Sequence, residues 1–139
     1  MAIENWYDAE RGDWVTADSR YQAVADEPRF ATLDEDVLLH PDRAWPLLLA
    51  LLAAVPEDGV DRVGCGPLET FVHLHGGVFA TELEREARDN PRFRDAVLNV
   101  ELRRGVRPPA VEARLCTAFG ARFELMPTDA IEADGGAEA

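Results

Sequence analysis

The chain has 139 residues, of which 47% are hydrophobic and 29% are charged. This balance excludes the composition of a disordered chain and predicts one soluble domain with its own core. The formal charge of −13 arises from 27 acidic residues against 14 arginines, without any lysine. Such an acidic surface repels phosphate backbones and anionic lipids, so nucleic-acid binding and membrane attachment are disfavoured. A basic protein is the expected partner.

The N-terminal segment and the cysteines indicate the compartment. The first eleven residues carry acids and Trp6, and they lack the cationic start and apolar run of a secretory signal. Cys65 and Cys116 lie far apart without paired spacing, which predicts two reduced, buried thiols rather than a disulfide framework. We therefore expect a cytoplasmic protein.

The strongest helical signal is AWPLLLALLAAV, which begins at Ala44. It follows two shorter helices, expected at residues 19–25 and 33–39. Because it is apolar on every side, it predicts a central core helix over about residues 43–55. Asp42 is the expected N-cap, Pro46 falls in the first turn, and Pro56 ends the helix. The run is too short to span a bilayer.

The sequence GCGPLETFVHLHGG predicts a further helix. Gly66 is the expected N-cap, Pro67 the first helical residue, and Glu69 can bond back to the cap. Gly76 and Gly77 end this helix. Amphipathic helices follow at residues 79–89 and 92–102, and another at residues 110–119.

Only residues 121–126 alternate like a strand. The sequence thus predicts an all-α fold, a compact multi-helix single domain around the central helix, with at most a minor strand near 121–126. Residues 1–127 form this domain, and residues 128–139 are expected to be a flexible acidic tail.

The segment from Ala44 to Leu102 joins a Trp-bearing apolar helix to GCGPLE, HLHG and DNPRFRDAV. This order resembles an uncharacterised family of small bacterial helical proteins that share a GxGPLE…HG…PxFRxAL pattern. The resemblance implies an all-helical fold. It implies no catalytic residue, because that family has no established activity.

Glu69 and His73 are the first candidates for chemistry. Their i, i+4 spacing allows a carboxylate to orient an imidazole as a general base, but a capping Glu beside a helical His is the preferred explanation. Cys65, His73 and His75 lack the paired clusters typical of structural zinc, and His75 is expected to pack near the core. We predict no catalytic residue, no metal and no cofactor.

Aromatic residues among carboxylates are the more informative pattern, because Trp and Tyr anchor interfaces while charge steers encounter. The alternative is a solvated acidic surface with Trp6 and Trp14 covering the core. The predicted partner-binding residues are Trp6, Asp8, Glu10, Asp13, Trp14, Asp34, Glu35 and Asp36.

The leading hypothesis is therefore an immunity or antitoxin-like inhibitor that binds a basic bacterial toxin. An accessory structural or regulatory domain is the alternative. A carboxylate or histidine enzyme is the third hypothesis.

Overall fold

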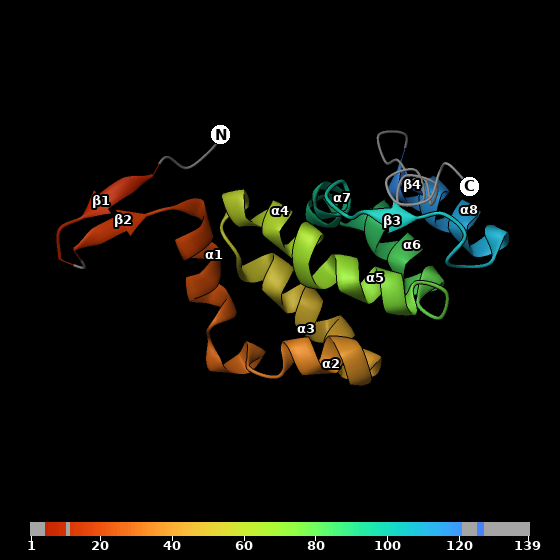
Figure 1. Cartoon of the computed structure of the whole chain (residues 1–139), viewed down its shortest axis with the longest axis horizontal. Helices are drawn as coiled ribbons and strands as arrows, with labels where there is room; N and C mark the ends of the chain where they lie inside the picture. Colours follow the sequence, from red (N-terminus) through yellow and green to blue (C-terminus); the bar gives the residue numbers. More distant parts are fainter. Residues whose placement is uncertain (1–4, 11, 121–124, 127–139) are drawn as a thin grey trace, which may run out of the picture.

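Helices make up most of the computed structural model, which describes residues 5–10, 12–120 and 125–126 (Figure 1). The predicted all-α single domain is confirmed. The short N-terminal hairpin was not predicted. The elements in chain order are β1 (Trp6–Asp8), β2 (Asp13–Val15), α1 (Ala17–Ala25), η1 (Pro28–Phe30), α2 (Leu33–Leu39), α3 (Pro41–Ala54), η2 (Glu57–Gly59), α4 (Val60–Val63), η3 (Gly64–Leu68), α5 (Glu69–His75), α6 (Ala80–Asp89), α7 (Pro91–Val97), β3 (Leu102–Arg103), α8 (Pro109–Phe119) and β4 (Leu125–Met126).

The central helix is α3, which begins two residues earlier than expected. His40 occupies the N-cap position, so the assignment of Asp42 as the cap was wrong. Pro46 consequently lies beyond the first turn, where it cannot donate to the carbonyl of Asp42. Leu48 and Leu52 are buried, in agreement with a core helix. Trp45 and Leu49 are only half-buried but pack against the core.

Trp45 joins α3 to the following helices. Its ring centroid lies 5.4 Å from that of Phe71, 6.0 Å from that of Phe79 and 6.1 Å from that of Phe93. These partners come from α5, the turn before α6, and α7. Aromatic pairs at such separations add to the free energy gained by burial alone. The cluster therefore fixes three helices around α3.

Two long-range hydrogen-bonded contacts close this core. The guanidinium of Arg92 donates to the carbonyls of Leu52, at 2.9 Å, and Val55 at the end of α3. A ring nitrogen of His75 lies 2.7 Å from the carbonyl oxygen of Val37. His75 thus packs near the core as predicted, and it ties α5 to α2.

The helix expected to begin at Gly66 is instead the continuation of α4. Helical segments follow one another without a break from Val60 to His75, and residues Gly64–Leu68 form a π-helical turn among them. Gly66 bends the backbone there, with φ −111° and ψ −108°. The predicted N-cap was therefore wrong, although the helix ends before Gly76 as expected.

The C-terminal elements match the prediction less closely. Helix α6 agrees with it to within one residue, whereas α7 ends at Val97 and Leu102 belongs to the short strand β3. Strand β3 pairs in parallel with β4, and β4 lies within the predicted strand 121–126. Residues 121–124 and the predicted tail 128–139 lie outside the described residues. In the described part of the chain, no helix combines the length and hydropathy needed to cross a membrane.

Candidate functional site

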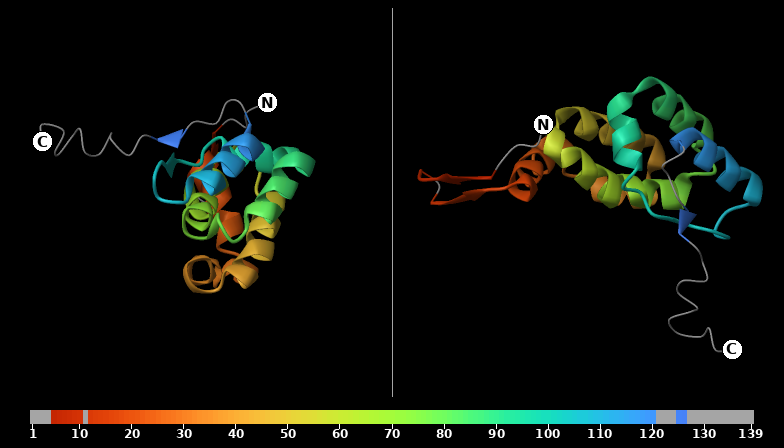
Figure 2. Two further views of the ribbon diagram at one scale, coloured as in Figure 1. Left: turned by 90° about the vertical axis from the view of Figure 1, so that its right-hand side faces the viewer. Right: turned by 90° about the horizontal axis from the view of Figure 1, so that it is seen from above.

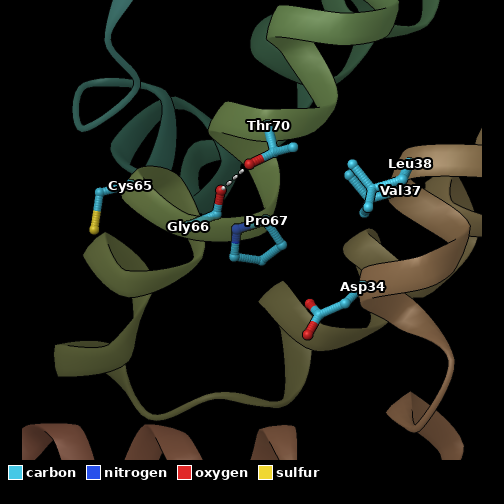
Figure 3. A pocket seen from close by; sticks show the side chains of 7 residues that line it. All are labelled: Asp34, Val37, Leu38, Cys65, Gly66, Pro67 and Thr70. Carbon is cyan, nitrogen blue, oxygen red and sulfur yellow. Dashed lines mark hydrogen bonds between the residues drawn. The ribbon is translucent and has the colours of Figure 1, made fainter.

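A groove runs between α2 and the η3–α5 segment, and Figure 3 shows part of its lining. One hollow of about 410 Å³ is continued along α5 by a second of about 340 Å³, because both are lined by Leu38 and Thr70. We call the two together the α2–α5 groove. The first hollow is also lined by Asp34, Val37, Cys65, Gly66 and Pro67, and the second by Glu69, His73, Leu74, Glu101 and Arg103.

The η3 turn shapes one wall of this groove. Pro67 has no N–H, so it cannot bond to the carbonyl four residues earlier as a regular α-helix requires. The hydroxyl of Thr70 donates to the carbonyl of Gly66 at 3.3 Å. Single π-helical turns often accompany functional sites in helical proteins. Here the turn places the backbone of Gly66 and the ring of Pro67 in the groove wall (Figure 3).

The three acidic residues of α2 that were predicted to bind a partner lie in different surroundings. Asp34 is exposed and lines the groove, whereas Glu35 is exposed but does not line it. Asp36 is only 2% exposed. Its carboxylate accepts a hydrogen bond from Thr32 at 3.0 Å and pairs with Arg43 at 3.1 Å. Asp36 therefore holds the α2–α3 corner and is not available to a partner.

The sequence contained a signal for this difference. Leu33, Asp36 and Val37 have i, i+3, i+4 spacing and are the buried residues of α2. Residues at that spacing share one helix face. The inward direction of Asp36 therefore followed from its neighbours, and treating the three acids as one cluster overlooked it.

The other predicted cluster lies on the β1–β2 hairpin. The strands are antiparallel, with Trp6 opposite Val15 and Asp8 opposite Asp13. In the turn, the carboxylate of Asp8 accepts a hydrogen bond from the amide of Glu10 at 3.0 Å. Gly12 has φ 75°, a conformation that favours glycine and closes the hairpin. The backbones of Asp13 and Trp14 are described, but their side chains are not.

The hairpin exposes aromatic surface. Trp6 is 46% and Tyr7 53% exposed, while Val15 is buried at the base. The guanidinium of Arg20 lies 4.9 Å from the centroid of the Trp6 ring, in a cation–π contact. Trp6 is therefore partly held by the body of the protein, yet about half of its surface remains exposed.

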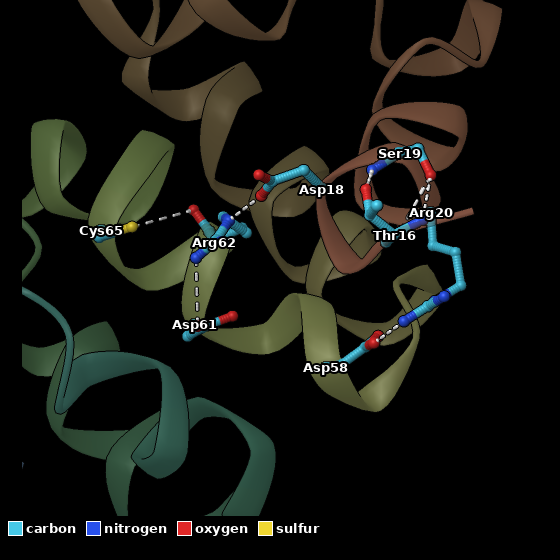
Figure 4. A network of polar contacts seen from close by, with 8 residues as sticks. All are labelled: Thr16, Asp18, Ser19, Arg20, Asp58, Asp61, Arg62 and Cys65. Carbon is cyan, nitrogen blue, oxygen red and sulfur yellow. Dashed lines mark hydrogen bonds and ion pairs between the residues drawn. The ribbon is translucent and has the colours of Figure 1, made fainter. Parts of the chain in front are cut away.

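Arg20 anchors the hairpin to the helices. It donates to the carbonyl of Val15 at 3.3 Å and forms an ion pair with Asp58, whose side chain is only 13% exposed (Figure 4). Nearby, Arg62 of α4 pairs with Asp18 of α1. The first contact is nearly buried and orients the hairpin, whereas the second is exposed and contributes little to stability.

The structure does not bring the two predicted clusters together. The hairpin projects from one end of the molecule, and α2 lies along the helical body beside α3 (Figures 1 and 2). Helix α1 separates them along the chain. The surface of the hairpin and the α2–α5 groove are therefore two distinct candidate sites.

Glu69 and His73, which were candidates for a carboxylate–imidazole pair, contact different residues. The carboxylate of Glu69 accepts a hydrogen bond from the amide of Glu101 at 2.7 Å, so it fixes the segment before β3 instead of capping its own helix. His73 is exposed, and its Nδ1 lies 3.5 Å from the guanidinium of Arg107. The two side chains are thus engaged with different neighbours.

The cysteines also differ from the prediction. Both are free thiols, but Cys65 is exposed in the groove and Cys116 is half-buried. Burial raises the pKa of the Cys116 thiol, and the Glu112 carboxylate adds to this increase. Among the described residues, no group of three or more His, Cys, Asp or Glu side chains is arranged to hold a metal ion.

These features define a small all-α domain with an open groove and a projecting hairpin. The chain belongs to a family of unknown function, DUF6869, whose model matches residues 20–118. The matched region contains the α2–α5 groove, whereas the hairpin precedes it. No curated protein and no solved structure matches the chain.

Proposed function

We propose that this protein is a binding module for a basic protein, and more specifically an immunity or antitoxin-like inhibitor of a bacterial toxin in the cytoplasm. The observation that carries the proposal is the projecting hairpin, on which Trp6 and Tyr7 remain about half exposed beside carboxylates. Aromatic side chains supply contact area at low cost in conformational entropy. The net charge of −13 supplies long-range attraction to a cationic partner.

Inhibition of a toxin requires two properties that this surface supports. Charge attraction raises the association rate, and exposed aromatic anchors lower the dissociation rate. A toxin that acts on an anionic substrate carries a basic cleft, which an acidic hairpin can cover. The ion pair of Arg20 with Asp58 keeps the base of the hairpin fixed, which reduces the entropy lost on binding.

Co-expression with candidate basic toxins tests the proposal. We expect the full chain to restore growth and to form a complex with the toxin that it inhibits. A Tyr7→Ala variant should weaken that complex, mainly through faster dissociation. Val78→Ala is the control, because Val78 is 84% exposed and lies far from the hairpin in the sequence.

A matched pair of charge variants separates local recognition from bulk charge. Glu10→Gln on the hairpin and Asp95→Asn on α7 each remove one exposed negative charge. The first should slow association more than the second. A stable host complex without rescue of growth would support the accessory-domain alternative instead, and equal effects of both variants would contradict recognition by the hairpin.

A further inference from the structure

We propose that the α2–α5 groove receives an amphipathic helix of a protein partner, with apolar residues in the groove and a Lys or Arg beside Asp34. This inference rests on the proposed function in one respect, the basic character of the partner. It assigns a second contact surface, which the hairpin does not supply. It also places recognition within the part of the chain that matches the family.

The groove offers apolar surface that the chain itself leaves uncovered. Leu38 is 57% exposed and lines both hollows, and Leu74 is 48% exposed in the second. Val37 and Pro67 extend the apolar wall of the first hollow. Exposed leucines that line one concave surface are typical of an interaction site, whereas scattered ones need no explanation.

The length of the groove fits two turns of a docked helix. Along one wall, the lining residues recur from Pro67 through Thr70 to Leu74. Seven residues at helical rise correspond to about 10 Å, which matches the span of anchors at i, i+3 or i+4, and i+7 on a docked helix. The first hollow is lined only by residues of the helical segments α2, η3 and α5, whereas β3 contributes Arg103 to the second. The first hollow therefore offers no strand edge to which an extended peptide could add.

The charges around the groove favour a cationic occupant. Its lining contains the carboxylates of Asp34, Glu69 and Glu101 against the single guanidinium of Arg103. Arg103 lies in the second hollow, so the Asp34 end has no basic residue in its lining. Within the described residues, Asp34 forms no ion pair. A cation at this end and apolar residues further along thus complement the groove, whereas a second copy of this acidic chain would bring like charges together.

Helix α2 provides its own matched control. Asp34 and Leu38 line the groove, while the neighbouring pair Glu35 and Leu39 has the same i, i+4 spacing and does not line it. Leu39 is 65% exposed, comparable to Leu38. Substitutions in the two pairs therefore change charge and exposed apolar area alike, and only one pair alters the groove.

The probe is a synthetic Leu/Lys peptide of about 15 residues with leucines at helical spacing, long enough to form a helix on binding. It is compared with a peptide of the same composition in scrambled order and with one of alternating Leu and Lys. Affinity is measured by fluorescence anisotropy. Occupancy of the groove is measured by the rate at which iodoacetamide alkylates Cys65 in the full chain.

We expect the helical peptide to bind more tightly than both comparison peptides and to slow alkylation of Cys65. Alkylation of Cys116 should not change, because this half-buried thiol does not line the groove. Leu38→Ser should weaken binding about tenfold, as expected for an anchor residue, and Asp34→Asn about threefold or more. Leu39→Ser and Glu35→Gln should remain within about twofold of the wild type.

Three results would overturn the inference. Equal binding of the scrambled peptide would show that charge alone suffices, and equal binding of the alternating peptide would show an extended occupant. Concentration-dependent dimerisation that Leu38→Ser abolishes would identify a second copy. None of these affects rescue of growth or the hairpin variants, so failure of the groove and failure of the proposed inhibitor are distinguishable.

Discussion

At the scale of single residues, Glu69 has a structural contact that its helix position did not predict. Its hydrogen bond to the amide of Glu101 joins α5 to the chain before β3. Glu69→Gln keeps an acceptor oxygen, so the free energy of unfolding should fall by less than about 1 kcal/mol, whereas Glu69→Ala should cost about 1–2 kcal/mol. Chemical denaturation measures both. Unchanged stability in both variants together with loss of partner binding would assign Glu69 to recognition.

Gly64 allows the close approach of two helices. A Cβ atom at this position would collide with the carbonyl oxygen of Ala96 on α7. Gly64→Ala should therefore destabilise the protein by about 1–3 kcal/mol or more, because the helices must move apart. Thermal unfolding of Gly77→Ala is the comparison, since a Cβ there meets only Val111 at 3.9 Å. Equal effects of the two variants would contradict the close packing.

At the scale of elements, α3 carries the largest share of the core. Leu48 is 2% exposed within it. Leu48→Ala should lower the free energy of unfolding by about 2–5 kcal/mol, because it leaves a cavity in a packed interior. Urea denaturation measures this loss, and Ala53→Ser on the exposed side of α3 is the control. A loss well below 1 kcal/mol would show that α3 is not the centre of the core.

The elements that sequence reasoning found are those with strong local patterns. Helix α2 has the predicted bounds because its apolar spacing and the following Pro41 define it. The start of α5 was misplaced because Gly66-Pro67 imitates a helix start. The constraint that makes Gly64 necessary comes from Ala96, a residue distant in the sequence. Local patterns do not contain such a contact.

The candidate sites were predicted in part for the same reason. Composition indicated an acidic surface, and Asp34 does line a groove. The groove itself arises from the packing of α2 against α5, two elements separated by α3 and α4, so sequence alone did not reveal it. The hairpin was missed because its strands are short and rich in acids, although Gly12 between aromatic segments is typical of a turn.

At the scale of the whole molecule, the charge of −13 opposes folding, because like charges repel one another in the compact state. Raising the ionic strength from 0.01 to 0.15 M shortens the Debye length from about 30 to about 8 Å. The thermal midpoint should therefore rise with added salt. A variant with Glu10→Gln, Glu35→Gln and Asp95→Asn should show a smaller rise, because it carries fewer repelling charges. A midpoint that falls with salt would show that ion pairs such as Arg20–Asp58 outweigh the repulsion.

The contact of Arg92 with the end of α3 has a consequence for the order of synthesis. The carbonyls of Leu52 and Val55 emerge from the ribosome well before Arg92, which is 40 and 37 residues further along. Until then the apolar helix α3 lacks both this cap and the aromatic partner on α7. A nascent chain arrested before residue 92 would therefore expose α3, and cotranslational folding is expected to be completed only once α7 has left the exit tunnel.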